Sequence, residues 1–365
     1  MIKAVIIGFA HMHVNEIAQY IAETKDFKLV GFADVPLKDK ENTSARYTRE
    51  WNIKNNSEKF NLTPYEDYKK MLDELKPDIA FILCDNKNKP IIVEECAKRK
   101  VNVSIEKPMA VSLEEALKIK EIVDKYQIEA VVNWPVIWRE YMHKQISVLE
   151  SGKVGKLIKA FYINGHTGPL GKGAKHRGVS EKAQEMTDEE RASTWWYKGT
   201  YGGGAFLDIG CYGCFVNQWA RDNEQDPPLS VMAIAGNYNT PFMDAPDNMA
   251  GLIEYKDSYG VVEGTWTVPQ ISLPTGPVYM CTDGVIFSDA NKEVVVMDCF
   301  GEKIEIDEFN IHPHIKHLPD HYAYCKKTGT PLHKTVTLDF NIKVMAIIDS
   351  LMTSSKSGNK EKVNV

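Results

Sequence analysis

The sequence contains no long hydrophobic run. None of its segments approaches the roughly 20 consecutive apolar residues that a membrane-spanning helix requires. The amino terminus also lacks the succession of basic segment, apolar stretch and cleavage site that marks a secretion signal. We therefore expect a cytoplasmic protein that does not have a membrane as its partner.

Positive charge is not in excess either. The chain has 44 Lys and Arg against 50 Asp and Glu, a net charge of -6, and no basic cluster. This balance argues against a nucleic-acid partner. The seven cysteines have no disulfide-type spacing; Cys211 and Cys214 form a CxxC pair, but no second pair and no thioredoxin-like context accompany it. We expect these cysteines to be structural.

What the chain does contain is enough apolar sequence for two domains. Its 365 residues are 43% hydrophobic and 26% charged, which is typical of a soluble globular protein. In the first part, apolar runs alternate with helical patterns, and this rhythm predicts a doubly wound parallel sheet of the α/β class. The expected strands are 2–7, 27–33, 78–83, 101–105 and 129–133. One expected helix begins at Val14, and three others span 65–75, 91–100 and 113–126.

The turn after the first strand carries part of a dinucleotide-binding fingerprint. Of the three glycines in GxGxxG, which let bare backbone approach a pyrophosphate, only Gly8 is present. Ala10 and His13 occupy the other two positions, so the motif alone is a weak signal. For His11 and His13, packing is the alternative role. The candidate cofactor contacts in this turn are Gly8, Phe9, Ala10, His11 and Met12.

Asp34 follows the second expected strand and lies 26 residues beyond Gly8. An acidic residue near this spacing hydrogen-bonds the ribose hydroxyls of a dinucleotide, although a loop or helix-capping role is also compatible with the position. Val35 and Pro36 provide no arginine for a 2′-phosphate, which favours NAD, while Lys38 leaves NADP open.

A second motif, Glu106-Lys107-Pro108, closes the strand expected at 101–105. Proline disfavours helical backbone for the residue before it, so Lys107 should be extended at the carboxyl end of the strand. Ligands bind at this end of open α/β sheets. A solvated lysine at a strand end is the alternative interpretation.

After residue 133 expected strands and helices no longer alternate regularly, which indicates two domains, at residues 1–133 and 134–365. A helix at 141–151, a strand at 157–164 and closing helices at 320–327 and 338–356 are expected. The polar segment 165–194 is too long for a simple connection unless it is functional or shields a site. Long strands with few helices between them predict a large, mostly antiparallel open sheet in an α+β domain; they are 229–238, 249–255, 260–268, 278–282, 285–288, 293–297 and 302–306.

A glycine run, Gly202 to Gly204, precedes a helix that we expect to begin near Ala205. Asp208 and Tyr212 would then lie four residues apart on one helix face. A carboxylate and a phenol in this arrangement could serve a proton transfer, or they could form an ordinary hydrogen bond on the helix surface.

Together, Ile105-Glu106-Lys107-Pro108, Gly202-Gly203-Gly204 and Asp208-Ile209-Gly210 with Tyr212 resemble the motifs of the Gfo/Idh/MocA oxidoreductase family. The resemblance extends over most of the chain. This sequence departs from it at Tyr212, where part of the family has histidine, and at Lys89, where the family often has histidine. Further matches are Asn86, Gly152-Lys153-Val154-Gly155 and Glu263-Gly264-Thr265-Trp266-Thr267.

The resemblance implies a Rossmann domain that binds NAD, with NADP as a further possibility, and a nicotinamide beside Lys107 that Asn86 and Glu106 also contact. It implies a sugar, polyol or related derivative as substrate. Our hypothesis for catalysis is that Tyr212 moves the proton and that Lys107 lowers the pKa of Tyr212. Asp208 would accept hydrogen bonds from substrate hydroxyls or hold Lys107 and Tyr212 in place.

Three more residues are candidate substrate contacts: His166, Trp138 and Arg139. For His166 a plain loop role is equally compatible, and for Trp138 an aromatic core role is the commoner one. The histidines 312, 314, 317 and 321 are interrupted by Pro313 and Pro319, so we assign no metal.

Two other functions stay open. Within the resemblance, one is an NAD-dependent glycosidase that oxidises, eliminates and restores its substrate. The other, from a different class, is a non-catalytic dinucleotide sensor, although a sensor would not need Lys107, Asp208 and Tyr212. A broad sheet with one apolar face predicts a homodimer or homotetramer.

Overall fold

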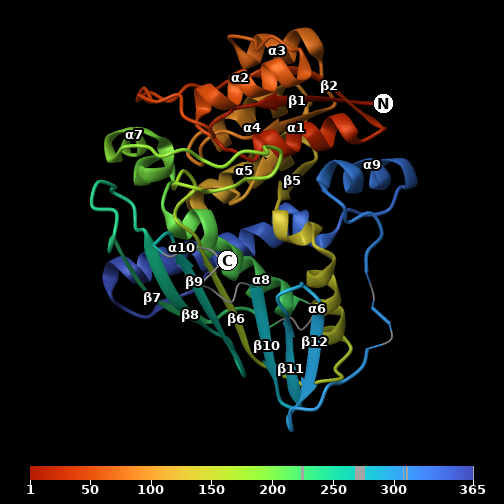
Figure 1. Ribbon diagram of the computed structural model, residues 1–365. Helices are drawn as coiled ribbons and strands as arrows, with labels where there is room; N and C mark the ends of the chain where they lie inside the picture. Colours follow the sequence, from red (N-terminus) through yellow and green to blue (C-terminus); the bar gives the residue numbers. More distant parts are fainter. Residues whose placement is uncertain (223–225, 268–275, 307, 310, 365) are drawn as a thin grey trace.

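The computed structural model describes residues 1–222, 226–267, 276–306, 308–309 and 311–364. Its amino-terminal part is a sheet flanked by helices, and its carboxyl-terminal part contains a second, larger sheet (Figure 1). The first sheet has the order β2-β1-β3-β4-β5 with all pairs parallel, as predicted. Its strands are β1 Ile2–Ile7, β2 Phe27–Ala33, β3 Ile79–Ile82, β4 Asn102–Glu106 and β5 Ala130–Asn133.

The helices of this part are α1 Val14–Glu23, α2 Arg49–Phe60, α3 Tyr68–Leu75, α4 Lys89–Lys98 and α5 Leu113–Tyr126. Helix α2 was not predicted, because it buries Asn52 and Asn56 rather than an apolar stripe. Helix α3 begins three residues later than predicted, because the Asp67 side chain accepts from the amide of Lys69 and caps the helix there.

The carboxyl ends of β1 and β3 meet where the strand order reverses. Gly8 follows β1 with φ of 94°, a conformation that side chains other than glycine's disfavour. A Cβ at Gly8 would also lie 2.5 Å from the backbone nitrogen of Cys84, just beyond β3. The crevice at such a reversal is where doubly wound sheets bind ligands.

The second sheet has the order β12-β11-β10-β6-β9-β8-β7-β13. Only β6 and β9 pair in parallel among the strands described, so the prediction of a mostly antiparallel sheet is confirmed. The strand expected at 302–306 does not form; Lys303 makes only an isolated bridge with Met297. The strands are β6 Leu157–Gly165, β7 Ser230–Gly236, β8 Asn248–Glu254, β9 Tyr259–Thr265, β10 Gly276–Cys281, β11 Gly284–Ser288, β12 Val294–Asp298 and β13 Glu361–Lys362.

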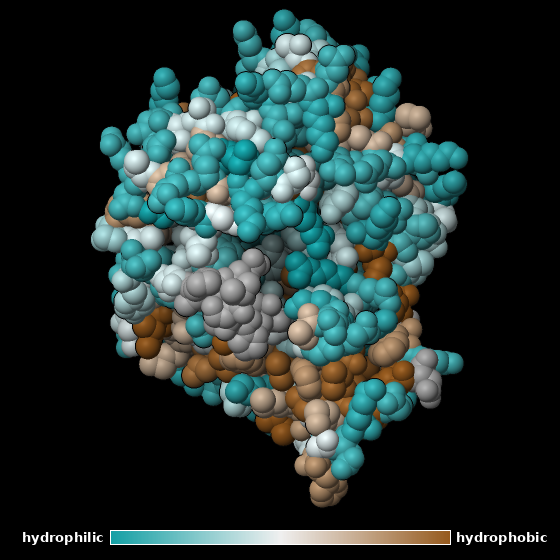
Figure 2. Space-filling view, viewed as in Figure 1, coloured by the Kyte–Doolittle hydropathy of each residue, from teal (hydrophilic) through white to brown (hydrophobic). Residues whose placement is uncertain are grey.

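Helices pack on one face of this sheet (Figure 1). A Cβ at Gly213 of α8 would lie 2.7 Å from Val262 of β9, which shows how closely the two elements approach. The other face is lined by exposed apolar side chains, and Figure 2 shows hydrophobic surface gathered over this half of the molecule. The remaining helices are α6 Glu140–Glu150, α7 Asp188–Ser193, α8 Cys211–Arg221, α9 Leu318–Thr328 and α10 Leu338–Ser357.

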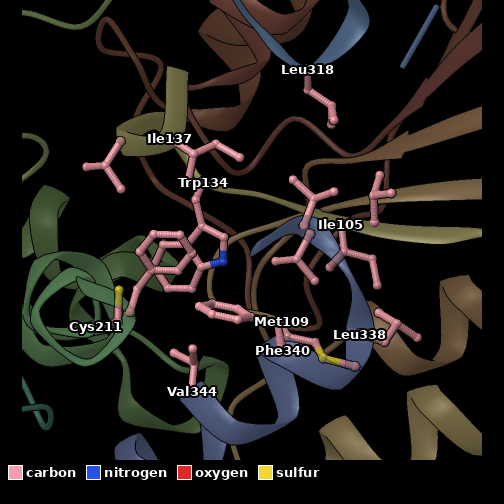
Figure 3. Close-up of a cluster of buried hydrophobic side chains, with 14 of the residues drawn as sticks. Ile105, Met109, Trp134, Ile137, Cys211, Leu318, Leu338, Phe340 and Val344 are labelled. Atoms are coloured by element: carbon pink, nitrogen blue, oxygen red, sulfur yellow. The ribbon is translucent and has the colours of Figure 1, made fainter. Parts of the chain in front are cut away.

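A buried cluster around Trp134 joins the two parts (Figure 3). Trp134 is 0% exposed, and its indole Nε1 donates to Oδ1 of Asn341 in α10 at 2.6 Å. Its ring lies 4.6 Å from that of Phe215 and 5.5 Å from that of Tyr212. The side chain of Tyr212 is therefore packed against the residue that follows β5.

The segment after β6 crosses back over the first part. The Trp195 indole donates to the carbonyl of Ala10 at 2.9 Å, and the Asn86 amide donates to the carbonyl of Gly202 at 2.8 Å. The Tyr47 hydroxyl donates to the carbonyl of Glu181. We call residues 165–204 the crossing segment. Separately, none of the described helices is long and apolar enough to cross a membrane.

Candidate active site

The end of β2 carries the carboxylate of Asp34. Its Oδ1 is buried and has no hydrogen bond of strict geometry among the described residues, while Oδ2 pairs with Nη1 of Arg49. Burial raises the pKa of Asp34, against the opposing effects of Arg49 and of the backbone amides of Val35 and Phe9. A carboxylate at this position fits a ribose hydroxyl, and together with the bare backbone at Gly8 it fits a dinucleotide. Arg49 was missed in the sequence because it lies 15 positions beyond Asp34 in an unpredicted helix.

At the end of β4, Lys107 meets the second part of the chain. Its Nζ lies 3.2 Å from Oδ1 of Asp208, also donates to the Asp208 carbonyl, and lies 4.8 Å from the ring centre of Tyr212. The expected helix from Ala205 is in fact a π-helical turn, Phe206–Gly210, which leads into α8. Such turns are frequent at functional sites. Asp208 and Tyr212 both still reach Lys107.

Burial and charge set the ionisation of this group. Burial lowers the pKa of Lys107, but the attraction of the neighbouring acidic groups, of which Asp208 is anionic at neutral pH, outweighs it and raises the pKa. Burial raises the pKa of Asp208, and Lys107 with His166 outweighs it and lowers the pKa. Lys107 is therefore cationic and Asp208 anionic at neutral pH.

Tyr212 corrects one expectation. Burial raises the pKa of its phenol, and the opposing effect of Lys107 is smaller. The hypothesis that Lys107 brings this pKa towards neutrality is therefore wrong, because desolvation of the phenolate outweighs the nearby cation. Tyr212 is a neutral phenol at pH 7.

Two aromatic residues of the second part hold Oδ2 of Asp208. Trp266 donates from Nε1 at 3.0 Å, and Nε2 of His166 lies 3.4 Å away. The amide of Gly168 donates to Nδ1 of His166 at 2.9 Å, so the neutral imidazole carries its proton on Nε2, facing the carboxylate. Trp266 lay within a matching motif but had no assigned role in the sequence.

A second cluster lies at the turn after β1. Nδ1 of His13 is 3.0 Å from Oε1 of Glu106, and the His13 amide donates to Nδ1 of His11. Oε2 of Glu106 accepts from Asn133 at 3.1 Å. The ligand atoms of His11, His13 and Glu106 lie within 4.8 Å of one another. The two carboxylate oxygens already have hydrogen-bond partners, which accounts for the cluster without an ion.

The other substrate candidates lie just after β5. Trp138 is partly buried and donates from Nε1 to Oδ1 of Asn133 at 2.8 Å. Nη1 of Arg139 donates to the Tyr141 hydroxyl at 3.2 Å, while its Nε is buried without a partner among the described residues. The guanidinium also lies near the phenols of Tyr162 and Tyr212.

The other tryptophans near the site, and the histidines after residue 311, have structural surroundings. Trp195 and Trp196 are buried and pack with His11, and Trp134 lies in the core described above. The rings of His312 and His321 are 4.8 Å apart, but among the residues the structure describes they are not part of a group with metal-ligand geometry. Lys89 is fully buried beside Glu106, a contact that its sequence did not indicate.

A parallel sheet with a dinucleotide-type crevice, next to a buried lysine, carboxylate and phenol, is the arrangement expected of an NAD(P)-dependent enzyme. Comparison with protein families gives the particular group. Residues 2–133 match the oxidoreductase family with an NAD-binding Rossmann fold, and residues 147–284 match the Gfo/Idh/MocA carboxyl-terminal domain. The chain belongs to the Gfo/Idh/MocA family, and it is an NAD(P)-binding oxidoreductase.

Solved structures share the whole fold at low sequence identity. The chain is similar to an oxidoreductase from Thermotoga maritima, with 17% identity, a TM-score of 0.74, and coverage of 99% of this chain and 100% of that one. An aldose-aldose oxidoreductase from Caulobacter crescentus, crystallised with glycerol, has 15% identity, a TM-score of 0.74, and coverage of 99% of both chains.

The WlbA dehydrogenase from Bordetella pertussis, in complex with NADH and UDP-GlcNAcA, has 16% identity and a TM-score of 0.73. The match covers 100% of this chain and 99% of that one. At these identities the similarity shows the fold alone. A comparison with curated protein sequences gave no match.

Proposed function

We propose that this protein transfers a hydride between the nicotinamide of NAD and a carbinol carbon of a sugar, polyol or related derivative. Residues 1–133 would bind the cofactor, and residues 134–365 would bind the substrate. The observation that carries the proposal is the buried contact of Lys107 with Asp208 and with the ring of Tyr212 at the carboxyl end of β4.

The cofactor supplies or accepts the hydride, and the protein must then orient the carbon and move a proton at its oxygen. Tyr212 is protonated at neutral pH, so it would protonate the substrate carbonyl oxygen during reduction and become a phenolate. In the reverse reaction this phenolate would accept the proton of the substrate hydroxyl. The Lys107 ammonium would stabilise the phenolate that forms. Asp208, held by Trp266 and His166, would fix Lys107 and accept from a substrate hydroxyl.

For the cofactor, we assign Asp34 to the ribose hydroxyls and the turn from Gly8 to Met12, including Phe9, Ala10 and His11, to the pyrophosphate. Asn86, Glu106 and Lys107 would lie around the nicotinamide. The position of the Asp34 carboxylate at the end of β2, where its Oδ1 has no hydrogen bond of strict geometry among the described residues, supports this assignment.

Arg139 narrows the substrate class. Its Nη1 donates a hydrogen bond to the Tyr141 hydroxyl, whereas its Nε has no partner among the described residues. The Nε side of a guanidinium can donate two parallel hydrogen bonds to a carboxylate. A sugar acid would place its carboxylate there, near Tyr212, with Trp138 beside the ring. Two similar structures were solved with L-tartaric acid and with UDP-GlcNAcA respectively, which supports an acidic substrate.

The test is a substrate panel of paired sugars and sugar acids, such as glucose with glucuronate and sorbitol with gluconate, each incubated with NAD. We expect NADH to form, with a preference for the acid of a pair. A panel in which no carbinol yields NADH, although NADH binds, would remove the dehydrogenase proposal.

A second candidate is an NAD-dependent glycosidase, which needs a retained cofactor. The crossing segment favours it, because Trp195 bonds to the carbonyl of Ala10 within the pyrophosphate turn. Protein purified with bound nicotinamide that cleaves glycosides without net NADH would support this function over the first. Cofactor binding without any turnover would support the sensor instead.

We also propose a homodimer or homotetramer formed through the outer face of the large sheet. Its exposed apolar side chains include Met232, Ile234, Leu252 and Met280. Such a face is typical of an interface. A monodisperse monomer by light scattering would contradict this proposal.

A further inference from the structure

Lys89 is the first residue of α4, and it is fully buried. Its Nζ donates to Oδ1 of Asn86 at 2.6 Å, to the carbonyl of Glu106 at 2.7 Å and to the carbonyl of Pro108 at 2.6 Å. Glu106 and Pro108 are the chain neighbours of Lys107 on its two sides. One ammonium thus bonds to the backbone both before and after Lys107.

These three hydrogen bonds use every donor that a lysine ammonium has. None of the three acceptors is a carboxylate oxygen, so the buried charge has no direct ion pair here, and burying it is costly. A methionine would fill a similar volume without that cost. The hydrogen bonds to the flanks of Lys107 are therefore what the ammonium contributes.

We propose that Lys89 is a positioning residue for Lys107. By holding both backbone flanks of Lys107, it keeps the Lys107 ammonium between the carboxylate of Asp208 and the ring of Tyr212. It also ties these flanks to Asn86, whose amide bonds to Gly202 of the crossing segment. The inference deepens the proposed function and rests on it for the catalytic role of Lys107.

The arrangement depends on pH. Burial lowers the pKa of Lys89 to about 8. A neutral amine has two N–H donors, so one of the three oxygens loses its hydrogen bond when Lys89 loses its proton. The flanks of Lys107 should loosen as pH rises through this value. The titratable groups that face Lys89 are Cys84 and Asp85 after β3, Glu106 and Lys107 at the end of β4, His11 in the turn after β1, and Cys211 of α8.

Amide hydrogen exchange tests this positioning without a substrate. We expect the backbone amides of residues 106, 107, 109 and 110 to exchange about tenfold faster in Lys89→Met than in the wild type at pH 7, after correction for intrinsic rates; Pro108 has no amide hydrogen. The wild type at pH 9 should show the same local increase relative to pH 7, and Lys89→Met should show no further increase. Lys87→Met is the matched control, because Lys87 lies two residues away, is half exposed, and pairs with Glu115.

NADH affinity from fluorescence titration at pH 7 and pH 9 is the second measurement. We expect it to weaken several-fold at pH 9 in the wild type and in Lys87→Met, and to be independent of pH in Lys89→Met. A merely structural lysine would lower the melting temperature without this pH dependence.

Exchange of the amides of residues 106, 107, 109 and 110 at pH 7 that is as slow in Lys89→Met as in Lys87→Met and the wild type would overturn the inference. If Lys89→Met does not fold, Lys89→Gln, which has at most two of the three N–H donors, makes the same comparison. Failure of the wild type to bind NADH at either pH would count against the proposed function instead, while the exchange result would still decide the role of Lys89.

Discussion

The indole of Trp266 donates a hydrogen bond to Oδ2 of Asp208 at 3.0 Å, and so a residue of the large sheet orients the carboxylate that pairs with Lys107. Trp266 directly follows β9, which pairs in parallel with β6, the strand that ends next to His166. The parallel pair within an otherwise antiparallel sheet therefore brings Trp266 and His166 to the same carboxylate. These two strands deliver the partners that hold Asp208.

Trp266→Phe should retain the ring volume but remove this donor. We expect the turnover number to fall about tenfold, because one hydrogen bond to a charged group is lost while Lys107 and His166 still contact Asp208. Asp208→Asn should cost more, because it leaves the buried Lys107 ammonium without its ion pair. Steady-state kinetics on a substrate from the panel checks the order of the two effects. Equal losses in both variants would contradict it.

Tyr212→Phe should reduce turnover by about 10² to 10⁴ while leaving NADH affinity little changed, because a positioned acid contributes that range. The phenyl ring preserves the packing against Trp134, so the variant should fold. NADH titration and the melting temperature provide the controls. An unimpaired Tyr212→Phe enzyme would remove Tyr212 from the mechanism.

Asp34→Asn should weaken NADH binding by about tenfold or more, because hydrogen bonds from ribose hydroxyls to a carboxylate are replaced by weaker ones. It should also strengthen NADPH binding relative to NADH, since Arg49 loses its carboxylate partner and can meet a 2′-phosphate. Arg49→Gln in the same background is the control, and it should abolish the gain. Fluorescence titration of both cofactors measures the two effects.

Stability should fall in mild acid. Burial lowers the pKa of His321 to about 4 and that of His333 to about 3, against about 6.5 in the unfolded chain. The unfolded chain then binds more protons between these values, so the stability from the neutral histidines is complete above pH 6.5 and is lost as pH falls towards 4. The slope is at most about 1.4 kcal/mol per pH unit for each histidine.

The double variant His321→Gln, His333→Gln should therefore show a smaller loss of the free energy of unfolding between pH 7 and pH 5 than the wild type. His13 acts in the opposite direction: burial lowers its pKa, but Glu106 outweighs this and raises it. Urea unfolding at several pH values makes the comparison. Parallel pH dependences in the two proteins would contradict this role for the histidines.

Most of the fold could be predicted, because its information is local. The apolar runs of the five parallel strands and the turn at Gly8 lie in short windows of sequence. Helix α2 escaped prediction because Asn52 and Asn56 fill its buried face through hydrogen bonds to Phe9, Tyr47 and Asn15 rather than through apolar contact. Periodicity of apolar residues cannot detect such a helix.

The site was predictable only in part, for a similar reason. Glu106, Lys107 and Asp208 belong to recognisable motifs, whereas Arg49, Lys89 and Trp266 act through tertiary contacts. The ionisation of Tyr212 was the clearest error, because the sequence shows which cation is nearby but not how deeply the phenol is buried. Desolvation is a property of the packed structure.

Hydride transfer itself is the most direct test of the account. A substrate identified by the panel, deuterated at its carbinol carbon, would be incubated with the purified protein and NAD, and the nicotinamide would be analysed by mass spectrometry. The account predicts that deuterium appears on the nicotinamide at a rate that falls about 10² to 10⁴ in Tyr212→Phe. Turnover of that substrate with no deuterium on the nicotinamide would contradict it.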